Sequence, residues 1–269
     1  MQSIDQILEE YRSLKLSEVI DFDKFNEYAI VHHSSSIEGS TLTENETRLL
    51  LDENLTPKGK PLTHTLMTKD HYDALRFSLN EADASASIPV SVNLIQKINA
   101  LVMKNTGSVY NTPLGVVDGT KGEFRKGNVS AGNAYFPSYD KVESLTVKLI
   151  SSINEKANGA STDKDKIELS FAAHFNLVSI HPFYDGNGRT SRLLMNYLQK
   201  KFDLPMAIVF KEDKNEYFTA LQDARKLNQI SPFYAFMYGQ YYKFLDLEIE
   251  AYKKISQNKG KTKGLSFLF

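Results

Sequence analysis

Residues 181–192 read HPFYDGNGRTSR, and no other stretch of this chain is so dense in chemically useful side chains. The segment holds a histidine, an aspartate, an asparagine, two glycines and two arginines. The helical pattern that follows predicts a helix beginning near Arg189, so the glycines lie where that helix starts. This combination suits a site that holds a polyphosphate against a proton acceptor.

The two glycines and the amide between them predict an anion-binding turn. Gly186 and Gly188 carry no side chain to block a ligand, and they can adopt backbone angles that turn successive N–H groups toward one point. The first turn of a helix adds free N–H groups and the positive end of the helix dipole. Asn187 can donate an amide hydrogen to a phosphate oxygen.

The charged side chains extend this prediction to a triphosphate with a cation. Arg189 and Arg192 are three residues apart, so they share one helix face and match two further phosphates. Asp185 beside an anion would be repelled unless a cation lay between them, and Mg²⁺ bound by one carboxylate and phosphate oxygens is the simplest solution. His181, with an ordinary pKa of about 6.5, suits proton transfer near neutral pH.

Each of these residues also has an ordinary structural interpretation. A histidine at a helix end often caps the helix, Gly-Asn-Gly is a common turn, and paired arginines usually form a solvated face. Because all of them occur within twelve residues, we favour the combined functional interpretation.

Composition excludes several other classes of protein. The chain has 269 residues, which allows one large domain or two smaller ones, and its 41% hydrophobic content is ordinary for a globular protein. A net charge of −1 provides no general attraction to nucleic acid or anionic lipid, so we expect no nucleic-acid partner. The absence of cysteine excludes disulfides, thiol catalysis and thiolate metal sites.

The sequence also predicts a soluble, cytoplasmic protein without a membrane partner. Residues 1–6 lack the basic start and apolar stretch of a signal peptide, and no apolar run approaches the length of a membrane span. The oligomeric state is not encoded legibly.

Helical periodicity dominates the chain, so the expected fold class is mainly α. Thr43 and Glu46 form the pattern of a capping box, Thr162 or Asp163 starts a later helix, and the proline after His181 ends that helix at Ile180. The expected helices cover about 8–14, 22–36, 44–51, 66–79, 91–104, 138–158 (capped by Ser138), 163–180, 189–201, 215–227 and 231–254.

One short segment lacks this helical periodicity. Glycines crowd the stretch 115–137, and Val129–Ala131 and Ala134–Phe136 flank Gly132-Asn133, a suitable two-residue turn. We predict a small β-hairpin whose tip is Ala131, Gly132, Asn133 and Ala134, the alternative being an irregular surface loop.

The run 181–192 resembles the signature of the Fic family (filamentation induced by cAMP), which is His-x-Phe-x-Asp/Glu-Gly-Asn-Gly-Arg-x-x-Arg. Every fixed position is present: His181, Phe183, Asp185, Gly186, Asn187, Gly188, Arg189 and Arg192. Gly122-Glu123-Phe124-Arg125 and Ala172-Ala173-His174 also look like this family, so the resemblance covers about residues 90–230. It implies a Fic fold, with a helical core and a small β-hairpin flap, divided into an N-terminal helical region (1–88), a catalytic core (89–230) and a C-terminal helix and tail (231–269).

The resemblance implies transfer of AMP from ATP to a Ser, Thr or Tyr hydroxyl of a protein, with release of pyrophosphate. His181 would be the general base, and Asp185 would hold Mg²⁺ between the α- and β-phosphates. Asn187 and the amides of Gly186 and Gly188 would stabilise the α-phosphate. Arg189 and Arg192 would bind the β- and γ-phosphates, and Phe183 would be a buried anchor.

Two further elements are implied by the resemblance. Tyr217 and Phe218 look like the aromatic wall of an adenine pocket, although an aromatic pair on a helix is more often core. The flap would bind an extended segment of the protein substrate through backbone hydrogen bonds, which read little sequence.

Residues 34–39 resemble the inhibitory motif of the family, Ser/Thr-x-x-x-Glu-Gly/Asn, with Ser34, Glu38 and Gly39 matching. An acidic residue in the last turn of a helix is unfavourable for the helix dipole and invites a basic partner. The implied partner is Arg192, which could then not hold the γ-phosphate. In some members the equivalent acid positions a water that removes AMP. The alternative is an ordinary surface glutamate.

Two other functions compete with AMP transfer. One is a related phosphotransferase or nucleotidyltransferase that uses another donor, but the intact Gly188 and Arg189 favour the AMP transferase. The other is a nucleotide-binding scaffold without activity, which the intact His181 argues against. His174 lies two helical turns before His181, yet no His-Glu-x-x-His pattern accompanies it, so we interpret it as a packed helix residue.

Overall fold

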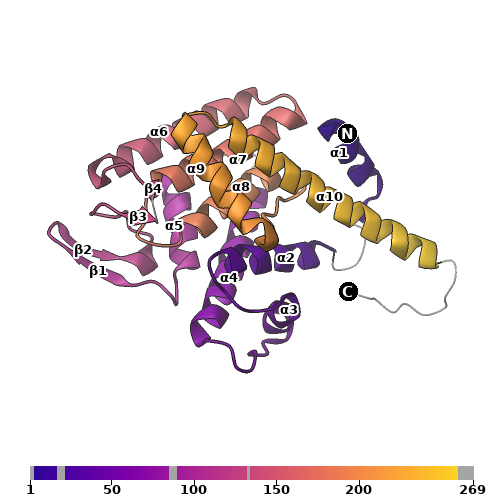
Figure 1. Ribbon diagram of the computed structural model, residues 1–269, viewed down its shortest axis with the longest axis horizontal. Helices are drawn as coiled ribbons and strands as arrows, with labels where there is room; N and C mark the ends of the chain where they lie inside the picture. Colours follow the sequence, from indigo (N-terminus) through magenta and orange to yellow (C-terminus); the bar gives the residue numbers. More distant parts are fainter. Residues whose placement is uncertain (1–2, 17–21, 85–89, 132–133, 260–269) are drawn as a thin grey trace.

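The computed structural model describes residues 3–16, 22–84, 90–131 and 134–259, and its described part is built almost entirely of helices (Figure 1). This confirms the predicted mainly α fold with a small hairpin. The helices are α1 (Ile4–Ser13), α2 (Phe22–Ile37), α3 (Glu44–Glu53), α4 (Leu62–Ala84), α5 (Val92–Val102), α6 (Val142–Gly159), α7 (Asp163–Ile180), α8 (Asn187–Lys201), α9 (Lys214–Leu227) and α10 (Ser231–Lys259).

Helix α8 is the centre of the molecule. Its residues from Arg189 to Gln199 are all buried, and it packs against α7, α4 and α5. Several of these buried residues are polar, which is unusual for the innermost helix of a core. Every one of them therefore needs a partner, and the neighbouring helices supply most of these partners.

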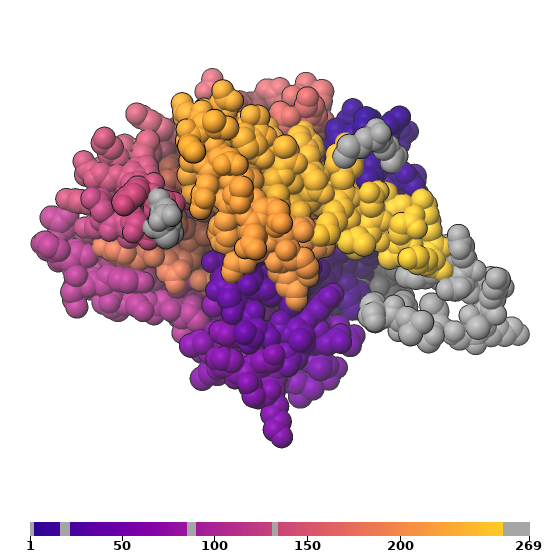
Figure 2. Space-filling view, in the orientation of Figure 1, coloured from indigo at the N-terminus to yellow at the C-terminus, as the bar shows by residue number. Residues whose placement is uncertain are grey.

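One hydrophobic cluster joins the three regions expected from the sequence. It includes Leu75 from α4, Leu193 from α8 and Tyr241 from α10, and α1 lies against α10. In Figure 2 the orange and yellow atoms of α9 and α10 cover the middle of one face, with the purple atoms of α3 and α4 below them and the indigo atoms of α1 above α10. Among the described residues, no helix combines the length and the apolar character needed to cross a bilayer.

Local sequence signals place most of the helix ends. Thr43 forms the predicted capping box with Glu46, and Thr162, predicted as a possible helix start, caps α7 in a capping box with Asp165. Ser138 does not cap α6: its side chain accepts no capping hydrogen bond, and a 3₁₀ turn, Tyr139–Lys141, comes before α6. Helix α7 ends at Ile180 as predicted, but His181 takes the left-handed conformation (φ 54°, ψ 59°) rather than the extended one expected before proline.

The predicted hairpin is present, and a second one accompanies it. Strands β3 (Ser130–Ala131) and β4 (Ala134–Tyr135) pair antiparallel, while the predicted turn Gly132-Asn133 lies outside the described residues. Strands β1 (Val109–Thr112) and β2 (Gly115–Asp118) form the other hairpin. Their turn carries no Asn-Gly or Asp-Gly pair; instead the Thr112 hydroxyl accepts from the Leu114 N–H and donates to the Gly115 carbonyl.

The glycine of the segment Gly122-Glu123-Phe124-Arg125 is required by its surroundings. Gly122 has φ +65°, and a Cβ there would lie 2.0 Å from the Gln96 carbonyl oxygen of α5. This close approach places Phe124 against Phe183, with ring centroids 5.6 Å apart. The segment is thereby fixed against both α5 and the loop before α8.

We expect Gly122→Ala to lower the free energy of unfolding by about 2–4 kcal/mol, because the added methyl group meets backbone and the φ angle strains alanine. Urea denaturation measures this. Gly239→Ala is the matched control: Gly239 lies within α10 with nothing within 4 Å of its Cβ position, so the substitution should stabilise by up to about 1 kcal/mol. Equal midpoints for Gly122→Ala and the parent protein would contradict the close packing.

Candidate active site

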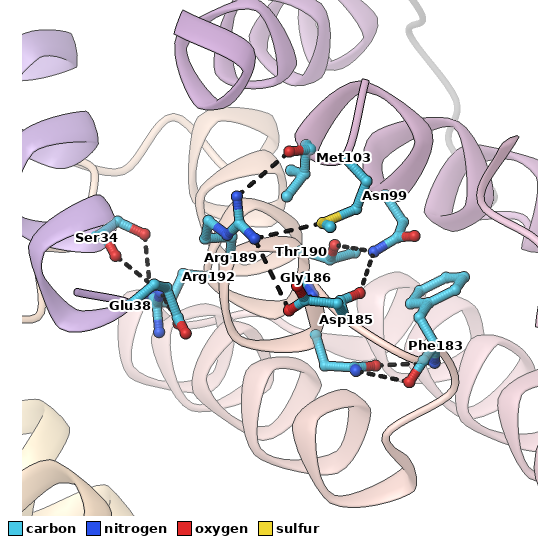
Figure 3. A network of polar contacts seen from close by, with 12 residues as sticks. Ser34, Glu38, Asn99, Met103, Phe183, Asp185, Gly186, Arg189, Thr190 and Arg192 are labelled. Carbon is cyan, nitrogen blue, oxygen red and sulfur yellow. Dashed lines mark hydrogen bonds and ion pairs between the residues drawn. The ribbon is translucent and has the colours of Figure 1, made fainter. Parts of the chain in front are cut away.

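The loop between α7 and α8 carries the run 181–186, and α5 holds it in place (Figure 3). The Asn99 amide nitrogen donates to the Asp185 carbonyl and to the Thr190 hydroxyl, both at 3.1 Å. Gly186 has φ +76°, and a Cβ there would lie 2.7 Å from the Met103 sulfur. The left-handed φ angle favours a glycine here, and a side chain would also displace the Met103 and Asn99 side chains that hold the loop.

Asn187, the first residue of α8, braces the same loop. Its side-chain oxygen accepts from the Phe183 N–H at 3.0 Å, and its side-chain nitrogen donates to the Phe183 carbonyl at 2.9 Å. Phe183 itself is buried, as expected of an anchor. In this arrangement the oxygen and one amide hydrogen of Asn187 are used within the loop, so its observed contacts position the loop and leave one hydrogen for a phosphate.

His181 is held by its backbone and its ring. Its Nδ1 lies 3.3 Å from the Val178 carbonyl oxygen. Since a carbonyl only accepts, the proton of a neutral ring belongs on Nδ1, which leaves the lone pair on Nε2. The imidazole also stacks on Phe136 with ring centroids 3.8 Å apart.

Burial lowers the pKa of His181 to about 4, although the bond to the Val178 carbonyl opposes this shift. The positive charges of Arg225 and Arg125 add to the lowering. At neutral pH the ring is therefore uncharged and able to accept a proton.

Arg192 is almost completely buried, and α2 binds it. Its Nε donates to the Ser34 hydroxyl at 2.8 Å, and its Nη2 donates to the Ser34 carbonyl at 3.1 Å and to the Glu38 carboxylate at 2.7 Å. The ion pair that the resemblance implies is thus present in the structure. Burial lowers the pKa of Arg192, but the interactions with Glu38 and Tyr217 together outweigh it and the net shift is upward.

The end of α2 fixes Glu38 at this position. Gly39 has φ +104°, its N–H donates to the Ser36 carbonyl, and the Ser40 N–H donates to the Ser35 carbonyl. This is the Schellman arrangement, in which a left-handed glycine closes the helix. Glu38 therefore lies directly after Ile37, at the C-cap of α2, and points toward α8.

The Glu38 carboxylate lies at the mouth of α8. A Cβ on Gly188 would be 2.4 Å from the Glu38 Oε1 atom, so only glycine allows the carboxylate this close. Burial raises the pKa of Glu38, but the charges of Arg192 and Arg189 outweigh it and the net shift is downward. An ionised carboxylate thus lies where the sequence predicts an anion.

Arg189 and Arg192 diverge, although they share one helix face. The Arg189 guanidinium donates to the Val102 carbonyl and to the Met103 sulfur, both at 3.3 Å, where α5 ends. It lies 3.9 Å from the Asp185 carboxylate, whose side chain is 61% exposed. Both hydrogen bonds are long, and the thioether sulfur is a weak acceptor, so Arg189 is held less tightly than Arg192.

Tyr217, predicted to belong to the aromatic wall of an adenine pocket, is buried on α9, and that role stays a prediction. It is 1% exposed, and its hydroxyl lies 2.9 Å from His174 Nε2. The Arg192 guanidinium lies 5.9 Å from the centroid of the Tyr217 ring, so Tyr217 packs against that arginine. Phe218 is 40% exposed and remains a predicted contact. His174 is a packed residue of α7, as interpreted from the sequence.

One residue, Phe136, brings the flap into contact with His181. Phe136 follows β4 directly and stacks on the imidazole, and Arg225 lies on Phe136 at 5.4 Å from the ring centroid. Of the predicted flap tip, Ala134 begins β4 and the backbone of Ala131 ends β3. Gly132 and Asn133 lie outside the described residues.

The sequence assigns no role to three residues of this site, although Arg125 belongs to the family-like segment Gly122-Glu123-Phe124-Arg125 and Phe136 to the predicted hairpin. Asn99, Arg125 and Phe136 are separated from the run 181–192 by 45 residues or more of chain. The only available signal for Asn99 is a polar residue on the buried face of α5, beside Ile95, Ile98 and Val102. Arg125 and Phe136 carry no such periodic signal.

Comparison with known proteins agrees with this geometry. The Fic/DOC family model matches residues 89–199. Protein adenylyltransferase Fic of Drosophila yakuba is 32% identical over 228 residues, which is 84% of this chain and 43% of the relative, and the Drosophila melanogaster protein gives the same values. The chain thus spans less than half the length of these curated relatives.

Solved structures show the same fold. A Fic domain-containing signalling protein from Bacteroides thetaiotaomicron matches with a TM-score of 0.79 and 25% identity, over 93% of this chain and 98% of that one. Fic-1 from C. elegans matches with a TM-score of 0.72 and 26% identity, over 93% of this chain and 69% of that one. With the complete signature folded into one loop, these matches establish that the chain belongs to the Fic family.

Proposed function

We propose that this chain is an autoinhibited protein adenylyltransferase, which moves AMP from ATP to a Ser, Thr or Tyr hydroxyl of a protein. The observation that carries the proposal is the neutral His181 ring, whose Nε2 lone pair is free, in the loop that leads into the start of α8. The Drosophila relatives, which are named protein adenylyltransferases, support it.

The proposed step is a displacement at the α-phosphorus of ATP. The hydroxyl oxygen bonds to the α-phosphorus, the bond from this phosphorus to the α–β bridging oxygen breaks, and pyrophosphate leaves. The hydroxyl proton moves to His181 Nε2. Backbone N–H groups at the start of α8, with Asn187, stabilise the charge on the α-phosphate.

Asp185 fits a magnesium site. Its carboxylate is largely exposed, and it accepts one hydrogen bond from the Gly186 N–H at 2.6 Å. An exposed carboxylate beside a polyphosphate is a common way to hold Mg²⁺, which keeps most of its other ligands as water and phosphate oxygens. The ion would neutralise charge on the phosphates, while Arg189 and Arg192 bind the outer ones.

Inhibition in this proposal follows from competition for one guanidinium. Arg192 donates to Ser34 and Glu38 and is 3% exposed, so it cannot also bind a γ-phosphate. The Glu38 carboxylate, close to Gly188, also repels phosphate from the start of α8. ATP can then bind only in a pose that does not react.

A second activity at the same site is removal of AMP from a modified protein. Glu38 is ionised and its side chain is 30% exposed, so it can accept a hydrogen bond from a water molecule at the mouth of α8. The flap, β3–β4, would hold an extended segment of the protein substrate in either direction of the reaction.

Radiolabelled ATP distinguishes the candidate functions. With Mg²⁺ and the Glu38→Gly variant, we expect label from the α-phosphate to appear on protein. His181→Ala should abolish this label, because no base remains to accept the proton. Label from the γ-phosphate would indicate the alternative phosphotransferase. No label with either the parent protein or Glu38→Gly would indicate a scaffold.

Glu38→Gly should raise modification of the chain itself or of a target by about tenfold or more, the factor that corresponds to about 1.4 kcal/mol of lost Glu38–Arg192 pairing. Initial rates of label incorporation measure this. Glu44→Gly is the control, because Glu44 is an exposed glutamate in the first turn of α3. If Glu38→Gly and Glu44→Gly react at the parent rate, the inhibitory role of Glu38 is wrong.

The rate of transfer should depend on pH through His181. With a pKa of about 4, the ring stays neutral at pH 5–8, so this group leaves the rate flat there. The rate should fall about tenfold per pH unit below about pH 4, where protonated His181 can no longer accept a proton. Circular dichroism at each pH separates this loss from unfolding. An acid limb centred near pH 6.5 would contradict the buried imidazole.

A further inference from the structure

The segment Gly122-Glu123-Phe124-Arg125 contributes a buried arginine that the proposed reaction does not use. Arg125 is 2% exposed. Among the described residues its guanidinium binds three carbonyl oxygens and no carboxylate: Nε donates to His181 at 2.8 Å, Nη1 to Gly127 at 2.9 Å and Nη2 to Pro137 at 2.5 Å. Burying a guanidinium is costly, and these bonds offset part of that cost.

The three carbonyls come from two parts of the chain that differ in function. His181 carries the imidazole of the active site. Gly127 and Pro137 lie at the two ends of the segment that forms the flap, before β3 and after β4. One planar side chain therefore joins both ends of the flap to the backbone of the histidine.

Arg125 also fixes the unusual backbone of His181. The Arg125 N–H donates to the Pro182 carbonyl at 3.0 Å, so two consecutive carbonyls of the loop bind the same residue. His181 has φ 54° and ψ 59°, a conformation that costs a residue with a side chain about 1–2 kcal/mol. The two hydrogen bonds hold the histidine in it.

The ring of His181 also contacts the flap, in addition to the backbone contact through Arg125. Phe136, half-buried, lies between the strand β4 and Pro137 and stacks on the imidazole with an interplanar angle of 17°. The Arg225 guanidinium lies over the Phe136 ring, 5.4 Å from its centroid, and donates to the Val178 carbonyl, which also binds His181 Nδ1. Backbone and ring of the histidine are thus both tied to the flap.

We propose that Arg125 is a positioning residue that makes the flap and His181 one mechanical unit, with Phe136 as the contact on the ring. A protein segment that pairs with β3 or β4 then sets the position of the imidazole through Arg125 and Phe136. The reactive geometry forms only when the flap is in its place. The proposal rests on the proposed function for its catalytic meaning, but its structural core can be tested without any transfer of AMP.

The first test is an NMR measurement on the free protein. With histidine labelled at ¹³Cε1 and the His181 signal assigned by His181→Ala, stacking on Phe136 should shift the His181 Hε1 resonance upfield. Arg125→Lys keeps the charge but cannot span three carbonyls from one nitrogen. The upfield shift should therefore shrink, and the ring should titrate closer to its ordinary value.

Arg12→Lys is the control for this substitution, since Arg12 also donates to two separate segments, at Asp163 and Asp203. It should leave the His181 resonance unchanged. An unchanged His181 resonance in folded Arg125→Lys would overturn the proposal.

The second test leaves Arg125 in place, in case Arg125→Lys does not fold. Phe136→Ala removes the half-buried ring from the flap. If flap and histidine form one unit, the Nε–H of Arg125 should exchange with solvent faster by about tenfold or more, because its bond to the His181 carbonyl opens more often. An exchange rate equal to that of the parent protein would show that the flap and the histidine are independent.

The third test concerns catalysis, in the Glu38→Gly background. Arg125→Lys should slow transfer from saturating ATP by about 100-fold, the cost of a displacement of about 1 Å in a catalytic group. The Kd for ATP with Mg²⁺, measured by calorimetry, should stay the same. A weaker Kd with an unchanged rate would contradict a positioning role. If Glu38→Gly itself transfers nothing, the proposed function fails, while the NMR and exchange results still decide this inference.

Discussion

The ion pair between Arg192 and Glu38 is the interaction on which the arrangement of the site depends. A guanidinium in the middle of a buried helix must be paired, since an unpaired charge there costs several kcal/mol. Ser34 and Glu38 provide this pairing from the end of α2. The same contact determines the position of the first turn of α8, because the carboxylate lies against Gly188. In the proposed function, the helix that would bind the polyphosphate is thus stabilised by a carboxylate that occupies the place of a phosphate.

Each element around α8 has a separate task. Helix α5 supports the loop through Asn99 and accepts Arg189 at its end. Tyr217 of α9, bonded to His174, lies behind Arg192. Arg125 and Phe136 connect the histidine to the flap. Four segments from distant parts of the sequence, α2, α5, α9 and residues 125–136, therefore contact residues 181–192. These contacts explain how a short signature acquires a defined geometry.

Much of this fold and site can be predicted from the sequence, because the determinants are local. Capping boxes at Thr43 and Thr162, the proline after His181 and the spacing of Ser34, Glu38 and Gly39 each act over a few residues. The rest depends on tertiary contacts. The direction of Arg189, the burial of Tyr217 and the roles of Asn99 and Arg125 follow from which helices meet at α8, and periodicity carries no such information. The hairpin β1–β2 escapes prediction because Thr112 stabilises its turn without the usual residue pair.

The distance in sequence between Glu38 and Arg192, 154 residues, has a consequence for biosynthesis. A ribosome makes the chain from its N-terminus, so α2 has emerged long before α8 leaves the exit tunnel. When α8 first packs onto its neighbours, the Glu38 carboxylate has therefore already been synthesised. In the proposed function, the inhibitory group is thus available from the moment at which the helix that it covers can fold.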